Sequence, residues 1–245
     1  MIKAVFFDIG KTLVDDPFPK AMHVVGRFLV QMDVLKSSNV DAFHETLTLK
    51  NSRIDSYQFS HYWGEEAIFN SAMSEYGIND DILVNKALTV YRREVRRLYQ
   101  TDPSLKALSN EELARLLSWL HDEKGLILGV ISDERTASIA LYWDILECRD
   151  IFSVVVTSEE VGCRKPCNQI FRYALDKAKV NAEDSLHIGD NPSRDITGAK
   201  DVGMMSILLT KFTHNKTNVG YDFMISDLYE LRSIIDTLTP TIQDS

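Results

Sequence analysis

Four polar residues stand at the ends of expected strands, and a fifth lies five residues after the last of them, in the first turn of a helix. They are Asp8 after AVFF, Ser132 after ILGVI, Lys165 within GCRKPC, and Asp190 and Asp195 within GDNPSRD. Open α/β sheets bind their ligands at the carboxyl ends of their strands, so these side chains are expected to meet in one site.

The residue types at these points suit phosphoryl transfer. An aspartate leaving a buried strand can act as a nucleophile, and proteins use Asp to form aspartyl-phosphate. A hydroxyl followed by backbone N–H groups, here Ser132 and then Asp133, can cradle phosphate oxygens. Taken alone, Asp8 and Ser132 would be better explained as ordinary turn residues.

The remaining residues supply charge. A cation fixed by the step from Lys165 to Pro166 can offset the negative charge of a phosphoryl group in transfer. Asp190 and Asp195 are two carboxylates that can hold magnesium, which prefers oxygen ligands. The two aspartates are therefore candidate metal ligands.

The elements that must position these residues alternate between β-branched runs and helical patterns, which is typical of a parallel sheet. The expected strands are Lys3 to Phe7, Ile127 to Ile131, Phe152 to Val156, Leu186 to Ile188, Ser206 to Leu209 and a short one at Asp222 to Ile225. Helices are expected at Glu111 to Glu123, with Asn110 as N-cap, at Asn168 to Ala178, and at Leu228 to Leu238.

The pattern changes between the first two strands, where only helical stretches occur. They are Pro19 to Met32, Val40 to Leu49, Ser60 to Tyr76 and Asp81 to Tyr99. We therefore expect an α/β fold with a doubly wound parallel sheet and a second, smaller all-helical domain. The expected core domain is 1–15 with 104–245, and the inserted domain is 16–103.

Bulk composition limits the possible partners. The 245 residues carry 27 basic and 36 acidic side chains, a net charge of -9, which argues against nucleic acid as the main partner. The apolar run before Asp8 is too short for a signal peptide, and no segment has the roughly 18 apolar residues of a spanning helix. A cytoplasmic chain that does not bind membranes is expected.

Three cysteines, Cys148, Cys163 and Cys167, do not form the disulfide framework of a secreted domain. Cys163 and Cys167 could be a metal pair, but no convincing partner ligands accompany them. Free thiols are the prediction.

The order and spacing of these residues are more specific evidence for a function than any one of the residues alone. The strings FFDIGKTL, a strand ending at Ser132, Lys165-Pro166 and GDNPSRDITGA together resemble the four motifs of the haloacid dehalogenase superfamily. The resemblance extends over the whole chain, including a helical cap inserted just after the first motif.

The resemblance implies a role for each matching residue. Asp8 would attack phosphorus and be phosphorylated for a moment, with Thr12 supporting the phosphate site. Ser132 and Lys165 would bind phosphoryl oxygens. Magnesium would be coordinated by Asp8, Asp190 and the backbone carbonyl of Gly10, while Asp195 would orient Lys165 or reach the metal through water. The partner would be a small phosphorylated substrate, and the chain a monomer or homodimer.

One position departs from the family pattern. Its phosphatases carry a second Asp, a general acid and base, where this chain has Gly10. Such assistance is worth about 10²- to 10⁴-fold in rate. The chain could still be a phosphatase, helped by water, a cap residue or a good leaving group. It could be a 2-haloacid dehalogenase-like hydrolase, a catalytically impaired binding or regulatory protein, or a phosphotransferase to another acceptor.

The resemblance also implies that the cap selects the substrate. Lys50, Asn51 and Arg53, in a polar stretch between two expected helices, are candidates for this role, although a solvated loop explains them better. His23, His44 and His61 could replace the missing acid but are better explained as surface or packing residues. The aromatic side chains Phe59, Tyr62, Trp63 and Phe69 are expected in the cap core.

Overall fold

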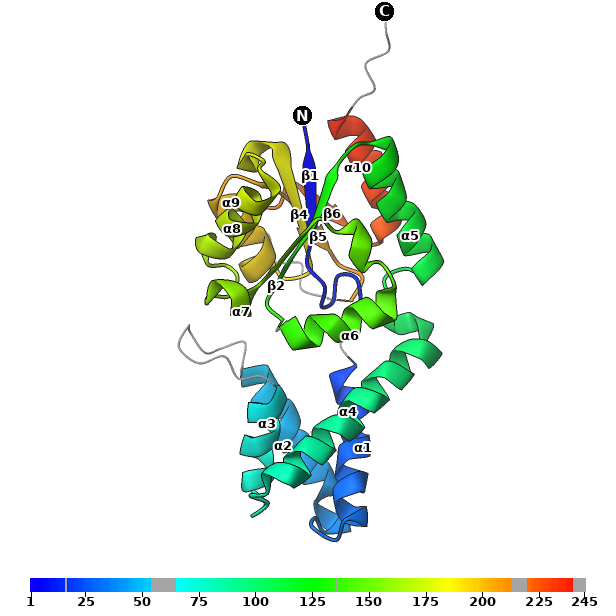
Figure 1. The fold of residues 1–245 in the computed structure, drawn as a ribbon, viewed down its shortest axis with the longest axis vertical. Coiled ribbons are helices and arrows are strands. Elements are labelled where there is room, and N and C mark those ends of the chain that lie inside the picture. Colours follow the sequence, from blue (N-terminus) through cyan, green and yellow to red (C-terminus); the bar gives the residue numbers. More distant parts are fainter. Residues whose placement is uncertain (16, 54–64, 135, 213–219, 240–245) are drawn as a thin grey trace, which may run out of the picture. The chain divides into compact units, whose positions relative to one another are not determined.

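The computed structural model describes residues 1–15, 17–53, 65–134, 136–212 and 220–239, without the side chains at 19, 51–53, 65 and 137 (Figure 1). The chain divides into two compact units, Met1–Asp15 with Lys106–Ser245 and Asp16–Leu105. The finer domain assignment, 1–15 with 104–245 and 16–103, stays a prediction.

A six-stranded parallel sheet forms the centre of the first unit, in the order β3-β2-β1-β4-β5-β6. Its strands are β1 Ala4–Phe7, β2 Ile127–Ser132, β3 Val154–Thr157, β4 Ser185–Gly189, β5 Met205–Leu209 and β6 Phe223–Ile225. All six expected strands are present, with ends that differ by at most two residues. The strand order reverses between β1 and β4, where doubly wound sheets bind their ligands.

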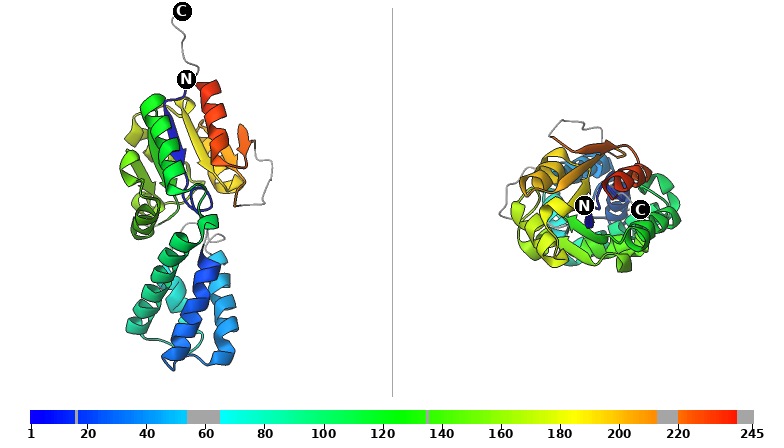
Figure 2. Two further views of the ribbon diagram at one scale, coloured as in Figure 1. Left: turned by 90° about the vertical axis from the view of Figure 1, so that its right-hand side faces the viewer. Right: turned by 90° about the horizontal axis from the view of Figure 1, so that it is seen from above.

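Helices cover both faces of this sheet, which confirms the doubly wound prediction. α5 (Asn110–Ser118) and α10 (Leu231–Leu238) lie on one face, and α8 (Asn168–Ala178) and α9 (Thr197–Asp201) lie on the other (Figure 2). Two further helices are α6 (Thr136–Leu146) and α7 (Ser158–Val161). The sheet is apolar on both sides because both are covered: β1 is wholly buried, and Phe171 of α8 packs against β2 and β3 residues.

The start of α5 differs from the sequence prediction. Ser109, rather than Asn110, is the N-cap. Its hydroxyl accepts a hydrogen bond from the Glu112 backbone N–H, and the Glu112 carboxylate accepts one from the Ser109 backbone N–H. This reciprocal pair satisfies two helix-end donors at once, which Asn110 could not do with Glu112 only two residues away.

The second unit consists of α1 (Phe18–Gln31), α2 (Val40–Arg53), α3 (Glu65–Ser74) and α4 (Asp81–Thr101). Its core includes an aromatic cluster, in which the Tyr91 ring packs against those of Phe18 and Phe69 at centroid distances of 5.8 and 5.6 Å. A Cβ on Gly26 of α1 would lie 2.9 Å from Val40 Cγ1 of α2, so glycine lets these two helices approach.

The polar stretch expected to be a loop is helical, because α2 continues through Lys50 to Arg53. The Lys50 ammonium group donates to Ser71 Oγ at 2.9 Å and pairs with Glu75 at 2.5 Å, which ties α2 to α3. The side chains of Asn51 and Arg53, and residues Phe59, His61, Tyr62 and Trp63, lie outside the described residues.

The other two cap histidines lie side by side. The His23 and His44 rings stack with centroids 4.0 Å apart, linking α1 to α2. Phe69 is fully buried, as predicted for a core residue. These contacts give His23 and His44 a packing role within the helical unit.

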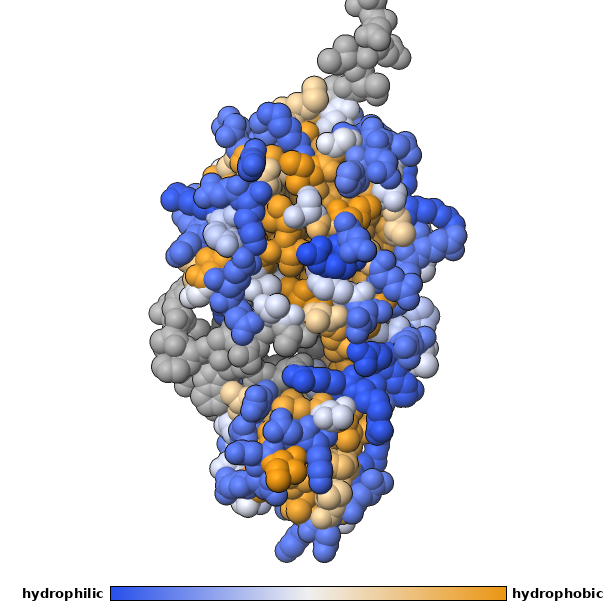
Figure 3. Space-filling view, viewed as in Figure 1, coloured by the Kyte–Doolittle hydropathy of each residue, from blue (hydrophilic) through white to orange (hydrophobic). Residues whose placement is uncertain are grey.

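Apolar side chains are visible on the surface of the helical unit (Figure 3). The exposed ones include Met32, Val34 and Ile82, and Ile82 also lines a groove of about 480 Å³ with Phe28 and Val90. Among the described residues, no helix is long and apolar enough to cross a membrane.

Candidate active site

The carboxyl ends of β1, β2 and β4 carry three of the predicted site residues. Asp8 directly follows β1, Ser132 ends β2, and Asp190 directly follows β4. The Asp8 backbone N–H donates to the Ile188 carbonyl of β4 at 2.9 Å, so the ladder continues up to the nucleophile candidate. All three side chains are buried. The sheet thus brings them together at the point where its strand order reverses.

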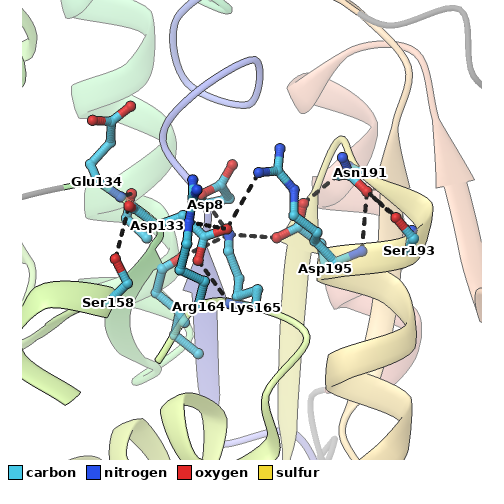
Figure 4. A network of polar contacts seen from close by, with 12 residues as sticks. Asp8, Asp133, Glu134, Ser158, Arg164, Lys165, Asn191, Ser193 and Asp195 are labelled. Carbon is cyan, nitrogen blue, oxygen red and sulfur yellow. Dashed lines mark hydrogen bonds and ion pairs between the residues drawn. The ribbon is translucent and has the colours of Figure 1, made fainter. Parts of the chain in front are cut away.

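Lys165 is the centre of the site (Figure 4). Its ammonium group lies 2.7 Å from Asp8 Oδ1, 2.6 Å from Asp195 Oδ1 and 3.1 Å from the Ile131 carbonyl oxygen. The residue is only 4% exposed, so these three acceptors replace its hydration. A buried ammonium with three donors and three oxygen partners is fully satisfied and rigidly placed.

The loop that carries Lys165 is held by short hydrogen bonds. Its backbone N–H donates to Asp133 Oδ1 at 2.8 Å, and the Cys167 N–H donates to the Arg164 carbonyl at 2.9 Å. The Lys165–Pro166 peptide bond is cis. The Asp133 side chain therefore has a positioning role for this loop that its predicted phosphate-binding role did not include.

Asp195 accepts hydrogen bonds on both carboxylate oxygens. Oδ1 accepts from Lys165 and contacts His187 Nε2 at 3.1 Å, while Oδ2 accepts from the Asn191 backbone N–H at 3.0 Å. The helical turn Pro192–Ile196 has π geometry, and the Asn191 side chain caps it. This turn brings Asp195 back toward the strand end, where its contacts orient Lys165.

Burial and neighbouring charges shift the pKa values of the acidic residues, upward for Asp8 and Asp190 and downward for Asp195. Burial raises the pKa of Asp8 to about 6, although the Lys165 ammonium acts in the opposite direction. Burial, with the carboxylates of Asp195 and Asp8, raises the pKa of Asp190 to about 7. For Asp195, burial is outweighed by Lys165 and His187, which hold its pKa well below the usual range. Burial alone would lower the Lys165 pKa, but Asp195 and Asp8 raise it above its ordinary value.

Two arginines lie beside this cluster. Arg194 Nη1 and Arg164 Nε lie 3.5 and 3.9 Å from Asp133 Oδ2. Four carboxylates, those of Asp8, Asp133, Asp190 and Asp195, thus face three cations in the described site. The excess of negative charge favours binding of a further cation.

The carboxylate geometry suits a metal ion. One oxygen each from Asp8, Asp190 and Asp195 lies within 4.8 Å of the other two, and all three residues are buried. Magnesium binds through one or two carboxylates plus water and substrate oxygens, so Asp8 and Asp190 suffice as protein side chains. The raised pKa of Asp190 reflects burial first and then the same crowding of negative charge, which a divalent cation would relieve.

The loop after β1 holds the two other predicted residues. Thr12 is fully buried, and its hydroxyl has no hydrogen-bond partner among the described residues. Buried hydroxyls normally have one, so a bound ligand would complete this site. Gly10 has open space around it: a Cβ there would meet no atom within 4 Å.

Ser132 shapes the loop after β2, because its Oγ accepts a hydrogen bond from the Glu134 N–H at 3.2 Å.

Sequence reasoning missed His187. It is fully buried in β4, packs edge-on against Phe171 and contacts Asp195, and burial lowers its pKa. The sequence feature that could have identified it is a titratable residue inside the apolar strand SLHIG, two residues before Gly189. An imidazole there is best explained by a partner, and Asp195 is that partner.

Glycine at position 189 is needed because Asp195 folds back over it. A Cβ at Gly189 would overlap the Asp195 carboxylate. We expect Gly189→Ala to lower the free energy of unfolding by about 1–3 kcal/mol, as overpacking does. Gly10→Ala is the matched control, since its Cβ enters open space. Urea denaturation of both variants measures this, and equal stabilities would contradict the close approach.

Comparison with known proteins agrees with this geometry. A family model described as haloacid dehalogenase-like hydrolase matches residues 2–203. The chain belongs to this family. Its fold is the family's α/β core with an inserted helical region.

Similar proteins include phosphatases. The glyceraldehyde 3-phosphate phosphatase of Methanocaldococcus jannaschii is 28% identical to this haloacid dehalogenase-like hydrolase, over 97% of this chain and 99% of the relative. That of Pyrococcus abyssi is 30% identical, over 84% and 81%. A HAD-hydrolase of Bacillus subtilis, solved bound to magnesium, is 18% identical with a TM-score of 0.68, covering 96% of this chain and 99% of the other, and shows the shared fold.

Proposed function

We propose that this hydrolase is a magnesium-dependent phosphatase of a small phosphorylated metabolite, acting through an aspartyl-phosphate on Asp8. The observation that carries the proposal is the buried Lys165 ammonium, 2.7 Å from Asp8, with the Asp190 carboxylate in the same cluster. An anionic nucleophile can approach an anionic phosphoryl group only where cations offset the repulsion. This site combines a nucleophile, a fixed cation and carboxylates able to hold a metal.

The chain's own residues divide the work as follows. The Asp8 carboxylate attacks phosphorus, the bond to the leaving oxygen breaks, and water then hydrolyses the phosphorylated Asp8. Lys165 stands beside the attacking oxygen, where its charge would face phosphoryl oxygens. Ser132, the Asp133 backbone and Thr12 would bind the remaining oxygens. Asp195 positions Lys165.

Asp8, Asp190 and the Gly10 carbonyl would hold magnesium, with Asp195 next to them. When bound, the ion would supply positive charge that stabilises the transferring phosphoryl group. The cluster of three buried carboxylates within 4.8 Å supports this assignment. It also weighs against a 2-haloacid dehalogenase, which needs no metal.

The names of the relatives point to the first substrate to test. Glyceraldehyde 3-phosphate is a three-carbon phosphate monoester, and phosphoglycolate, named in more distant relatives, is a two-carbon one. We infer that the substrate is a monoester of this size class.

The test is phosphate release from glyceraldehyde 3-phosphate and from an aryl phosphate. We expect magnesium to support turnover, EDTA to lower it by at least ~10²-fold, and added magnesium to restore it. Equal rates with and without EDTA would contradict the metal assignment. Chloride release from a 2-haloacid without metal would favour the dehalogenase instead, and inactivity toward aryl and acyl phosphates would favour a binding protein.

Gly10 allows a second test, of the missing general acid. Because a Cβ at this position meets nothing within 4 Å, Gly10→Asp can enter without displacing the loop. The new carboxyl group is expected to raise turnover of alkyl phosphates by about 10²-fold, because their poor leaving groups need a proton. Aryl phosphates, which leave without one, should gain much less.

Gly10→Asn is the matched control, because its amide fills the same space but cannot donate the proton. Phosphate release from an alkyl and an aryl phosphate is measured for both variants. If Gly10→Asp folds normally and gains no more than Gly10→Asn, the explanation of Gly10 as a missing acid is wrong.

A further inference from the structure

His187 is a polar side chain inside the apolar core of the first unit, next to the active site. It lies in the middle of β4 and is fully buried. Strand pairing places it beside Phe6 of β1 and Ser206 of β5. A buried imidazole costs free energy unless it is hydrogen-bonded, so the reason for an imidazole at this position lies in the contact that it makes.

Packing fixes the orientation of this imidazole. The Phe171 ring of α8 meets the His187 ring edge-on, with centroids 5.3 Å apart and an interplanar angle of 89°. The Phe171 ring is itself confined, because a Cβ on Gly198 of α9 would overlap it and would lie 3.0 Å from the Pro166 Cα. The imidazole is thus held with Nε2 toward Asp195.

The surroundings of the two ring nitrogens identify the tautomer. Nε2 lies 3.1 Å from Asp195 Oδ1, and an ionised carboxylate oxygen can only accept a hydrogen bond. Nδ1 is buried and has no hydrogen-bond partner in the part of the chain that the structure describes. A proton on Nδ1 would therefore be buried without an acceptor, and a bare Nε2 would repel the carboxylate. The neutral form with its proton on Nε2 fits both nitrogens.

The carboxylate that accepts this proton also holds the active-site lysine. Asp195 Oδ1 accepts from the Lys165 ammonium at 2.6 Å as well as from His187, and Oδ2 accepts from the Asn191 backbone N–H at 3.0 Å. Three donors from three segments of the chain thus fix the plane of the carboxylate. The same ammonium lies 2.7 Å from Asp8 Oδ1, so contacts run without a break from the imidazole to the proposed nucleophile (Figure 4).

We propose that His187 is a positioning residue for phosphoryl transfer: its Nε2–H bond to Asp195 Oδ1 holds this carboxylate so that the Lys165 ammonium faces Asp8 and the phosphoryl group. This inference rests on the proposed function. The imidazole is closed to solvent, and its hydrogen-bond partner among the described residues is Asp195. It therefore acts through Asp195 and does not exchange protons with the substrate.

Loss of this donor is expected to affect turnover more than substrate binding. Asp195 Oδ1 would keep one partner in place of two, and the ammonium would no longer be held at its present distance from Asp8. Removing a partner that orients an active-site group typically costs about 10- to 100-fold in activity, and we expect kcat to fall by this factor. KM should change little, because the charge of Lys165 is needed most in the transition state.

Two variants separate the hydrogen bond from the space that the ring fills. The amide N–H of His187→Gln extends about as far as Nε2 and keeps the donor, whereas His187→Met fills a similar volume without one. Met buries no polar group, but Gln leaves part of its amide unpaired, so the urea midpoint of the Met variant should be at or above that of the Gln variant. The kcat values should follow the opposite order, with Gln close to the unmodified enzyme. A residue with only a packing role would give the same order in both measurements.

His121→Met is the matched control. The His121 side chain is 53% exposed, so its replacement should change neither kcat nor the urea midpoint. The tautomer is measured without substrate, by a long-range ¹H–¹⁵N correlation spectrum of the full-length protein. The His187→Met variant identifies the signals of this ring among those of the six histidines. We expect the proton on Nε2 and a bare Nδ1.

The outcomes separate this inference from the proposed function. In an enzyme that releases phosphate, the inference is overturned by a proton on Nδ1, by a His187→Met protein that keeps full kcat, or by a folded His187→Gln protein as slow as His187→Met. Each of these results leaves the proposed function standing. An unmodified protein that releases no phosphate from the monoesters tested would overturn the proposed function, and the positioning role with it.

Discussion

Replacing Asp8 with Asn is expected to lower phosphate release by at least ~10⁴-fold, because an amide cannot form the phosphorylated intermediate. Asn has the same shape and fits the same space at the end of β1. The effect should be on turnover in the steady state and should be similar for aryl and alkyl phosphates. It should also abolish the phosphorylated form of this residue, whether that form is detected as an acid-stable phosphate or through a fluoride complex that mimics it.

The substitution should leave the fold intact. Asp8 shares Lys165 with Asp195, so the ammonium keeps a carboxylate partner at 2.6 Å after the charge at position 8 is removed. The change also relieves the repulsion that helps to raise the pKa of Asp190. We therefore expect the free energy of unfolding to change by no more than about 1–2 kcal/mol.

Asp176→Asn provides the matched control. It removes the same charge from an exposed position on α8 and should leave phosphate release unchanged. Phosphate release and urea denaturation are measured on both variants. Retention of more than a few per cent of the activity by a folded Asp8→Asn protein would show that another residue is the nucleophile.

The sheet and most of the site could be predicted from sequence for one physical reason. Parallel strands buried on both faces appear as short β-branched runs, and their carboxyl ends converge at one edge. Asp8, Ser132 and Asp190 were therefore placed correctly from the residues that precede them. Lys165 reaches the same edge from the loop after α7. Its place in the site was predicted from the order and spacing of the motifs of the family that the sequence resembles.

What the sequence did not reveal depends on side-chain contacts between distant segments. Both oxygens of Asp195 accept protein hydrogen bonds because of the π turn at Pro192–Ile196 and because of His187. The sequence shows His187 only as an unexpected titratable residue in an apolar strand. The extension of α2 through Lys50 depends on tertiary partners, Ser71 and Glu75. Local propensity does not determine such contacts.

Replacing Lys165 with Met is expected to affect both activity and stability. Loss of the cation beside Asp8 should lower phosphate release by ~10²–10³-fold, the usual effect of removing one group that stabilises transition-state charge. Removal of one partner of a buried ion pair leaves an uncompensated charge and costs about 3–5 kcal/mol. Here both Asp8 and Asp195 lose the ammonium, while Met fills a similar volume.

The loss of stability should depend on pH. In the native protein Lys165 helps to hold the Asp195 pKa below its unfolded value, so this carboxylate stabilises the fold above about pH 4. In Lys165→Met the folded-state pKa of Asp195 should rise above the unfolded value of about 3.9, and the pKa of Asp8, already raised to about 6, should rise further. Stability is then lost as pH rises through the new pKa values. The difference between the two proteins should therefore grow from about pH 5 to pH 7.5.

Urea denaturation in EDTA at those two pH values measures this difference without interference from bound metal. Lys177→Met is the control, because the Lys177 ammonium pairs with Glu160 at 2.7 Å with both side chains more than a third exposed. Such a surface pair contributes about 0–1 kcal/mol, with little dependence on pH in this range. If Lys165→Met were no less stable than Lys177→Met, or if its deficit were the same at both pH values, the buried carboxylates would not depend on Lys165 for their charge. The role of Lys165 would then be confined to catalysis, and the arrangement of Asp8 and Asp195 around it would need another source of stability.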